Sequence, residues 1–73
     1  MLITKSKNIS KIFGKNLKKL RVEKQMSQGD IARALGVHRS YISGLERGVR
    51  NPTLINIERI ARAMGAEIRK LLE

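Results

Sequence analysis

Apolar residues recur along this chain at helical spacing, and glycines separate one apolar stripe from the next. The first stripe begins at about Ile9, and its members are Ile9, Ile12, Phe13, Leu17 and Leu20. Residues three or four positions apart lie on one face of a helix, and lysines occupy most of the remaining positions. The pattern therefore predicts an amphipathic first helix, in which Gly14 costs about 1 kcal/mol relative to alanine. Residues 1–8 precede this helix as a short N-terminal arm.

Two short helices follow, and both carry local start or stop signals. Ser27 and Asp30 have the spacing of a capping box, in which the serine side chain accepts from the backbone N–H three residues on. Gly36 is expected to end this second helix in the left-handed conformation. A third helix covers about residues 38–47 and stops at Gly48. Two short helices joined by a glycine-containing turn predict a helix-turn-helix.

Two more apolar stripes complete the chain. Thr53 is the predicted N-cap of a fourth helix, and Gly65 closes it. The apolar positions of the fourth helix are Leu54, Ile57, Ile60, Ala61 and Met64. Residues 66–73 form a last short helix, with apolar positions Ile68, Leu71 and Leu72. Because no strand-like alternation is present, we predict an all-α fold of five helices in one domain that spans residues 9–73.

Composition narrows the class of protein. A length of 73 residues allows one compact domain. Sixteen Lys and Arg against six Asp and Glu give a formal net charge of +10, which indicates a polyanionic partner, nucleic acid first and an anionic membrane surface second. No window has the length of a membrane span, and no secretory signal is visible. The expectation is a cytoplasmic protein that associates with the nucleoid when bound to DNA.

The chain lacks the residue sets that catalysis or metal binding needs. It has no cysteine and one histidine, its six carboxylates are scattered, and its glycines form no phosphate-binding loop. We therefore predict neither an enzyme nor a metal site, and no cofactor. The basic, amphipathic first helix also fits a helix that lies on a membrane surface, but the caps and glycine stops favour a globular core.

The third helix carries the candidate functional surface. At about 100° per residue, Ile42 and Leu45 face the core, and a polar set faces outward, namely Arg39, Ser40, Ser43 and Arg47. Arginine donates in bidentate fashion to guanine O6 and N7, and serine adapts to donor or acceptor base edges. Gly44 beside this face is expected to allow close approach. An ordinary amphipathic surface helix would show the same wheel.

Groups that suit phosphate binding flank the third helix. The start of the second helix exposes backbone N–H groups beside Gln28, and the loop after the third helix contains Arg47, Arg50 and Asn51. Contacts of this kind fix the register of a protein on a duplex without reading its sequence.

The runs 20–32, 35–37 and 41–48 resemble the lambda-repressor-like (Cro/repressor, XRE-type) helix-turn-helix family. The resemblance covers residues 9–72 and implies a five-helix DNA-binding domain that acts as a dimer on a two-fold symmetric operator. The stretch 39–47 is most similar to the controller proteins of restriction–modification systems. Those proteins regulate their own promoter and that of the endonuclease. Phage repressors and antitoxins share the scaffold and remain alternatives.

The resemblance implies a role for each candidate residue. The base-reading set is His38, Arg39, Ser40 and Ser43, of which Ser43 is expected mainly to hold phosphates. The phosphate-binding set is Gln28, Tyr41, Arg47, Arg50, Asn51 and Thr53. The family pattern also pairs Arg21 with Glu46, as a structural salt bridge between the first and third helices.

Aliphatic side chains in the C-terminal part exceed what so small a core can bury. The last helix is too short to bury all of its apolar side chains, and Ile55 and Ile57 cannot both face the same core. The predicted homodimer interface therefore consists of Ile57, Ile68, Leu71 and Leu72. The alternative is that Ile68 and Leu71 cap the core of a monomer. With no second domain to hold a ligand, no small-molecule effector is expected, and protein concentration is the predicted input.

Overall fold

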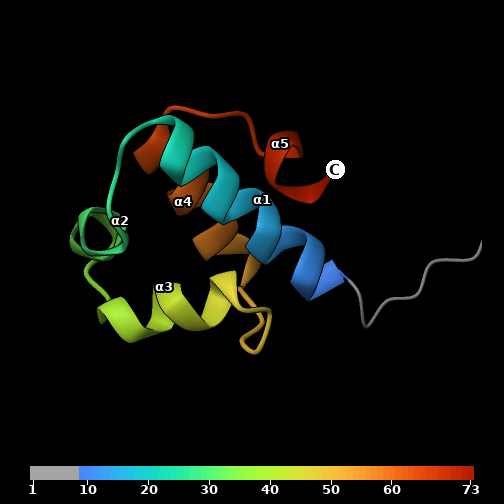
Figure 1. Cartoon of the computed structure of the whole chain (residues 1–73), viewed down its shortest axis with the longest axis horizontal. Coiled ribbons are helices and arrows are strands. Elements are labelled where there is room, and N and C mark those ends of the chain that lie inside the picture. The colour runs from blue at the N-terminus through green and yellow to red at the C-terminus, as the bar shows by residue number, and fades with distance from the viewer. Residues whose placement is uncertain (1–8) are drawn as a thin grey trace, which may run out of the picture.

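The computed structural model describes residues 9–73 and contains five helices (Figure 1). In chain order they are α1 (Ile9–Glu23), α2 (Gln28–Leu35), α3 (Arg39–Glu46), α4 (Leu54–Met64) and α5 (Arg69–Leu72). The predicted N-terminal arm, residues 1–8, lies outside the described residues. No strand occurs in the part of the chain from Ile9 onward, so the predicted all-α fold of five helices is confirmed.

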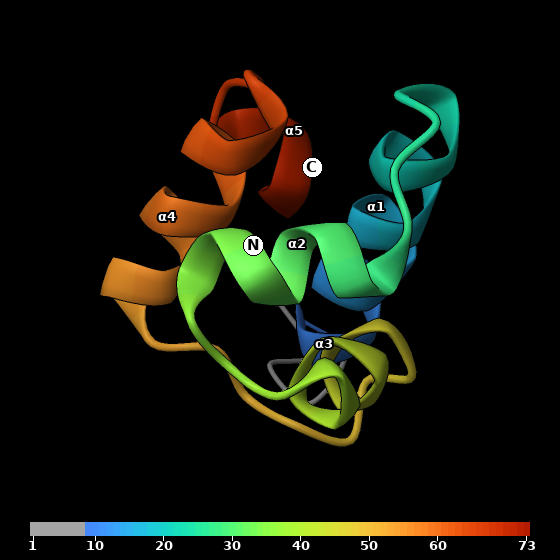
Figure 2. The same cartoon turned by 90° about the vertical axis from the view of Figure 1, so that its left-hand side faces the viewer.

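Local capping chemistry defines the helix-turn-helix formed by α2 and α3. The Ser27 hydroxyl accepts from the backbone N–H of Asp30 at 2.9 Å, and the Asp30 carboxylate accepts from the backbone N–H of Ser27 at 2.8 Å. The hydrogen bond from the Ser27 backbone N–H stabilises the charged carboxylate and is the largest of the effects that hold the pKa of Asp30 below its ordinary value. Gly36 then ends α2 at φ 72°, as predicted. Figure 2 shows α2 lying across the front of the molecule with α3 directly below it.

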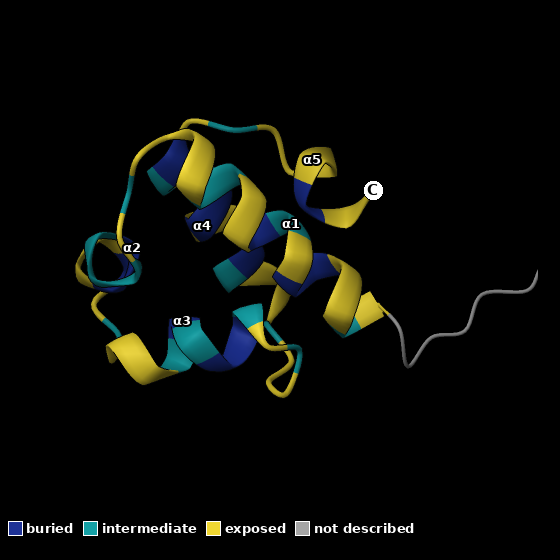
Figure 3. Ribbon diagram, in the orientation of Figure 1, coloured by how far each residue is buried: buried dark blue, intermediate teal, exposed yellow. Residues whose placement is uncertain are grey.

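The core is aliphatic apart from one aromatic ring, and every helix contributes to it. Buried surfaces of α1, α3 and α4 turn toward one another (Figure 3). The fully buried large side chains are Phe13, Leu17, Ile31, Ile42, Leu45, Ile60 and Leu71. Five residues assigned to apolar stripes are exposed and lie outside this core, namely Ile9, Ile12, Leu54, Ile68 and Leu72. The first three stand at the first turn of a helix.

The last helix is shorter than predicted, and it closes the core. It covers Arg69–Leu72 only, and the side-chain amide of Asn16 on α1 donates to the carbonyl oxygen of Leu71 at 3.0 Å. Leu71 is fully buried, and Ile57 on α4 is also buried. Leu71 is therefore part of the monomer core and has no surface for a partner, so its prediction as an interface residue is wrong. Ile57 packs in the core but is 8% exposed and lines an apolar groove beside Leu72, so its role in an interface stays a prediction.

Gly14 lies where α1 crosses α3. A Cβ at this position would lie against the carbonyl oxygen of Leu45 and 2.7 Å from that of Glu46. Real Cβ atoms do not approach backbone oxygens so closely, so the crossing distance of the two helices requires glycine here. The conformational cost of a glycine inside a helix is offset by the packing that its missing side chain allows.

We expect Gly14→Ala to lower the free energy of unfolding by about 1–3 kcal/mol, because the added methyl group must push α1 away from α3. Gly29→Ala in α2 is the matched control, since its Cβ would meet the flexible guanidinium of Arg33 at 3.3 Å and the Ser27 hydroxyl oxygen at an ordinary contact distance of 3.6 Å. That control should be neutral or stabilising by up to about 1 kcal/mol. Urea unfolding monitored by circular dichroism measures both variants. A Gly14→Ala variant as stable as Gly29→Ala would contradict the close crossing.

Candidate nucleic-acid interface

The two faces of α3 separate as the wheel predicted. Ile42 and Leu45 have no exposed surface, whereas Arg39 and Ser40 are exposed. Ser43 is half-buried, and Arg47 is exposed at the C-cap of the helix. One side of α3 is thus fixed to the core, and the other presents a guanidinium and hydroxyl groups to solvent.

His38 is the N-cap of α3. Its Nδ1 atom accepts from the backbone N–H of Ser40 at 3.1 Å and lies 2.8 Å from the Ser40 hydroxyl oxygen. The two residues are therefore held together at the first turn, next to Arg39. Three of the four predicted base-reading residues form one exposed cluster at the start of α3.

Tyr41 belongs to a network that joins α3 to α4. Its hydroxyl accepts from the side-chain amide of Asn56 at 3.0 Å, and the guanidinium of Arg50 lies 5.2 Å from the centre of its ring. The stem of Arg50 crosses Gly44, where a Cβ would come within 2.5 Å of Arg50 Cγ. Gly44 is therefore buried beneath Arg50 and does not widen the outward face, which corrects the sequence prediction. Asn56 was not predicted, since no sequence signal joins it to Tyr41.

The loop between α3 and α4 is attached to the start of α1. The Ser10 hydroxyl donates to the side-chain oxygen of Asn51, and the Lys11 side chain packs over Gly48. Thr53 caps α4 by accepting from the backbone N–H of Asn56 at 3.0 Å, as predicted. Loop residues 47–53 therefore have a defined position beside α3.

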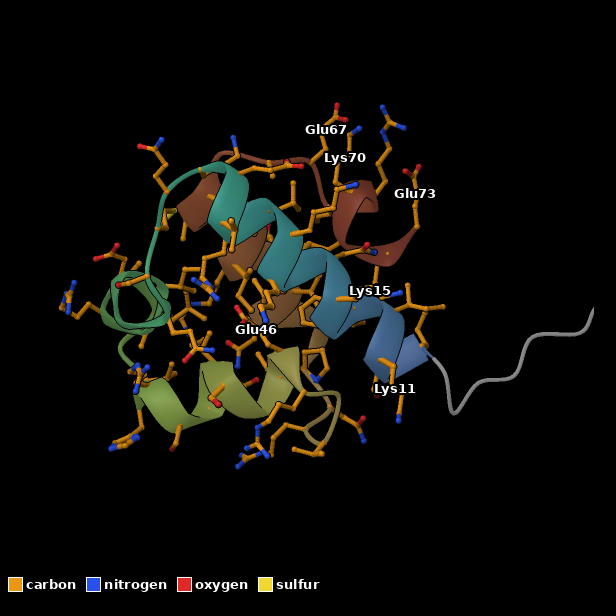
Figure 4. The ribbon with its side chains drawn as sticks, viewed as in Figure 1. Lys11, Lys15, Glu46, Glu67, Lys70 and Glu73 are labelled. Carbon is orange, nitrogen blue, oxygen red and sulfur yellow. The ribbon has the colours of Figure 1, made fainter. Side chains whose placement is uncertain are left out.

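One carboxylate links the first three helices. Glu46 on α3 accepts from Arg21 Nε at 2.6 Å and from Arg21 Nη2 at 3.1 Å, so the predicted ion pair is present. It also accepts from the Gln28 amide at 3.0 Å, while Arg21 Nη1 donates to the carbonyl oxygen of Met26 at 3.0 Å. Glu46 lies between α1 and α3 in Figure 4. Its hydrogen bond raises the pKa of Arg21, which keeps the guanidinium charged.

The side chain of Gln28 is only partly available for the predicted contact with phosphate. Its Nε2 atom is committed to Glu46, which leaves one N–H and the side-chain oxygen for other partners. The remaining predicted interface residues on α3 and the following loop lie together on one side of the molecule, below α1 in Figure 1.

Among residues 9–73, no group of three His, Cys, Asp or Glu side chains could hold a metal ion. Of the helices in the described part of the chain, none is long and apolar enough to cross a membrane.

Comparisons with known proteins agree with this geometry. A family model described as Helix-turn-helix matches residues 17–71. The control protein C.BamHI of Bacillus amyloliquefaciens is 43% identical over 67 residues, which cover 90% of this chain and 83% of the relative. The chain belongs to the helix-turn-helix family, whose members are DNA-binding transcription regulators and not enzymes. Within that family it is similar to the controller proteins of restriction–modification systems.

Solved structures support the same relationship. The restriction–modification controller protein C.AhdI of Aeromonas hydrophila superposes with a TM-score of 0.81 at 44% identity, over 85% of this chain and 94% of that one. The controller protein C.Esp1396I, solved as a tetramer in complex with its natural 35 base-pair operator, superposes with a TM-score of 0.74 at 32% identity. That match covers 89% of this chain and 96% of C.Esp1396I.

Proposed function

We propose that this protein is the controller of a restriction–modification system, which binds a two-fold symmetric DNA operator as a homodimer in the cytoplasm and regulates transcription. The observation that carries the proposal is the outward side of α3, where Arg39 and Ser40 stand exposed beside a loop with two further arginines. The similarity to C.BamHI and C.AhdI supports the same function.

Base reading is assigned to the start of α3. Arg39 donates to O6 and N7 of a guanine, and the hydroxyls of Ser40 and Ser43 contact neighbouring base edges. His38 turns its second ring nitrogen to the groove, because Nδ1 is occupied by Ser40. A helix carries these groups into the major groove when its axis lies along the groove.

Phosphate binding is assigned to residues around this helix, namely Gln28, Tyr41, Arg47, Arg50, Asn51 and Thr53. Arg47 and Arg50 supply charge, and the others supply hydrogen bonds. The contacts of Tyr41 with Arg50 and Asn56 favour this role because they hold the phenol and the guanidinium together before DNA arrives. Contacts to phosphate set position and orientation rather than sequence preference.

Dimerisation is assigned to apolar surface at the C-terminal end. Ile68 is 43% exposed and Leu72 is 40% exposed. Leu72 also lines an apolar groove of about 190 Å³, together with Ile9, Phe13, Pro52 and Ile57. A two-fold contact sets the same patch of each subunit against its copy. Two reading helices about 34 Å apart then meet successive major grooves of one duplex.

We expect Leu72→Asp to give a folded monomer with much weaker operator binding, since a charge in the apolar contact opposes dimerisation. Analytical ultracentrifugation at micromolar concentration should show a dimer for the unmodified protein. Val22→Asp, which alters an exposed side chain of α1, should leave the dimer intact. An unmodified chain that stays monomeric and binds its operator as a single copy would exclude this interface.

A footprint on the DNA upstream of the gene for this protein tests the function directly. The expected result is protection of two symmetric half-sites, lost when one guanine in each half-site is changed. Neighbouring genes for a methyltransferase and an endonuclease support the controller assignment. A neighbouring toxin gene, with a toxin that binds this protein, would favour the antitoxin alternative.

A further inference from the structure

Beyond the residues assigned so far, α1 carries a second basic surface. Lys11, Lys15 and Lys18 fall within about 60° of one another around the helix, at about 100° per residue. All three are exposed, on the side of α1 away from Phe13 and Leu17. We call this set the lysine ridge. Its three ammonium groups are spread over about two turns of the helix.

The charge of the lysine ridge is not neutralised by the protein. Within residues 9–73, none of the three lysines forms an ion pair. Residues 1–8 contain no acidic side chain that could supply a partner. The carboxylates on either side of α5 are already engaged, since Glu67 and Glu73 pair with Arg69 at 3.0 and 3.3 Å. Three uncompensated cations on one helix face favour an external anion.

The position of Lys11 indicates which kind of anion binds the lysine ridge. Its stem lies on Gly48, so that a Cβ there would be 2.9 Å from Lys11 Cγ, and the adjacent Ser10 bonds to Asn51. Gly48 and Asn51 belong to the loop that carries Arg47 and Arg50. In Figure 4, Lys11 points down from α1 toward the side of α3, whereas Lys70, Glu67 and Glu73 stand at the opposite edge. The Lys11 end of the lysine ridge therefore lies next to the loop that carries the proposed phosphate contacts.

We propose that the lysine ridge binds the sugar–phosphate backbone of the same duplex that α3 reads, with Lys11 in direct contact with one phosphate. Lys15 and Lys18 lie one and two turns further along α1, and their charges add to the electrostatic attraction between the ridge and the DNA backbone. The contact is independent of base sequence, because it involves only phosphate charge. This inference rests on the proposed function, and it adds to the interface a helix outside the helix-turn-helix.

The salt dependence of binding tests the ridge. Each phosphate neutralised on B-DNA contributes about 0.9 to the slope of log affinity against log salt. Lys11→Met keeps the stem over Gly48 but removes the charge, so the slope should be shallower by about 0.9 for each subunit and by about 1.8 for the homodimer. The advantage of the unmodified protein over this variant should then shrink about 12-fold between roughly 50 and 200 mM salt. Preference for operator over random DNA should be unchanged.

Two variants serve as controls. Lys70→Met on α5 removes the same charge from the opposite edge of the molecule and should leave the slope unchanged. Lys11→Arg retains the charge and should retain the slope. Thermal unfolding by circular dichroism establishes that each variant is folded before binding is measured.

The outcomes separate the ridge from the proposed function. Equal slopes for Lys11→Met and the unmodified protein would overturn the proposed phosphate contact of the lysine ridge. An equal decrease in slope for Lys11→Met and Lys70→Met would overturn it too, because that result would reflect net charge alone. An unmodified protein that binds operator and random duplexes equally overturns the sequence-specific function. In that case the slope on random duplex still tests Lys11, since phosphate contacts do not depend on sequence.

Discussion

Replacing Glu46 by alanine is expected to lower the free energy of unfolding by about 3–5 kcal/mol, even though it removes a negative charge from the DNA-reading helix. The Glu46 side chain is 4% exposed and that of Arg21 is 14% exposed. Without the carboxylate, the enclosed guanidinium retains only its bond to Met26, and the Gln28 amide loses its acceptor. Against a total stability of about 5–15 kcal/mol, such a loss is a large fraction of the free energy of unfolding.

The exposed pair of Glu58 and Arg62 is the matched control. It has 55% and 79% of its side-chain surface exposed, and Glu58→Ala should change stability by no more than about 0–1 kcal/mol. The double variant Arg21→Met/Glu46→Leu should recover most of the loss, because neither charge is then left without a partner. Urea unfolding curves give the free energy of unfolding of all three variants. Equal midpoints for Glu46→Ala and Glu58→Ala would mean that the Glu46 network adds nothing to stability.

Replacing Arg39 by alanine is expected to weaken operator binding by about 1–3 kcal/mol in each half-site. A homodimer carries the substitution twice, so the total loss on a symmetric operator is about 2–6 kcal/mol for two independent half-sites. Binding to random DNA should change far less, because base contacts supply little of it. Competition between operator and random duplexes at fixed salt gives both quantities.

Arg47→Ala is the control for this measurement. Arg47 is exposed at the end of α3, and its loss should weaken binding to all sequences alike and flatten the salt dependence. Arg39→Ala should instead relax the preference at one symmetric base position and leave the slope nearly unchanged. Equal losses on operator and random DNA for Arg39→Ala would refute base reading by this residue.

Features set by neighbouring residues could be predicted from the sequence. Ser27 and Asp30 form their capping box within four residues, and the left-handed Gly36 follows from the absence of a Cβ. The outward face of α3 was also predictable, since helical periodicity fixes which side chains share a side. The ion pair of Arg21 and Glu46 was found through the family resemblance and not from spacing, because the two residues lie 25 positions apart.

Features that depend on how helices meet could not be predicted. Periodicity gives the apolar direction of a helix but not where its neighbour ends, so Leu54 joined the predicted stripe although it is 84% exposed. Leu71 was assigned to a dimer because nothing in its sequence context shows that Asn16 holds α5 against α1. Gly14 and Gly44 owe their places to contacts with Glu46 and Arg50 that only the folded chain creates.

The carboxylate that joins α1, α2 and α3 also bears on the kinetics of recognition. Because Glu46 ties Arg21 and Gln28 to the reading helix, α3 is presented to DNA as part of a preorganised body, with no folding step between encounter and docking. Association should then be governed by electrostatic steering of a +10 protein toward the duplex. Differences between good and poor operators should consequently appear in residence time rather than in the rate of arrival.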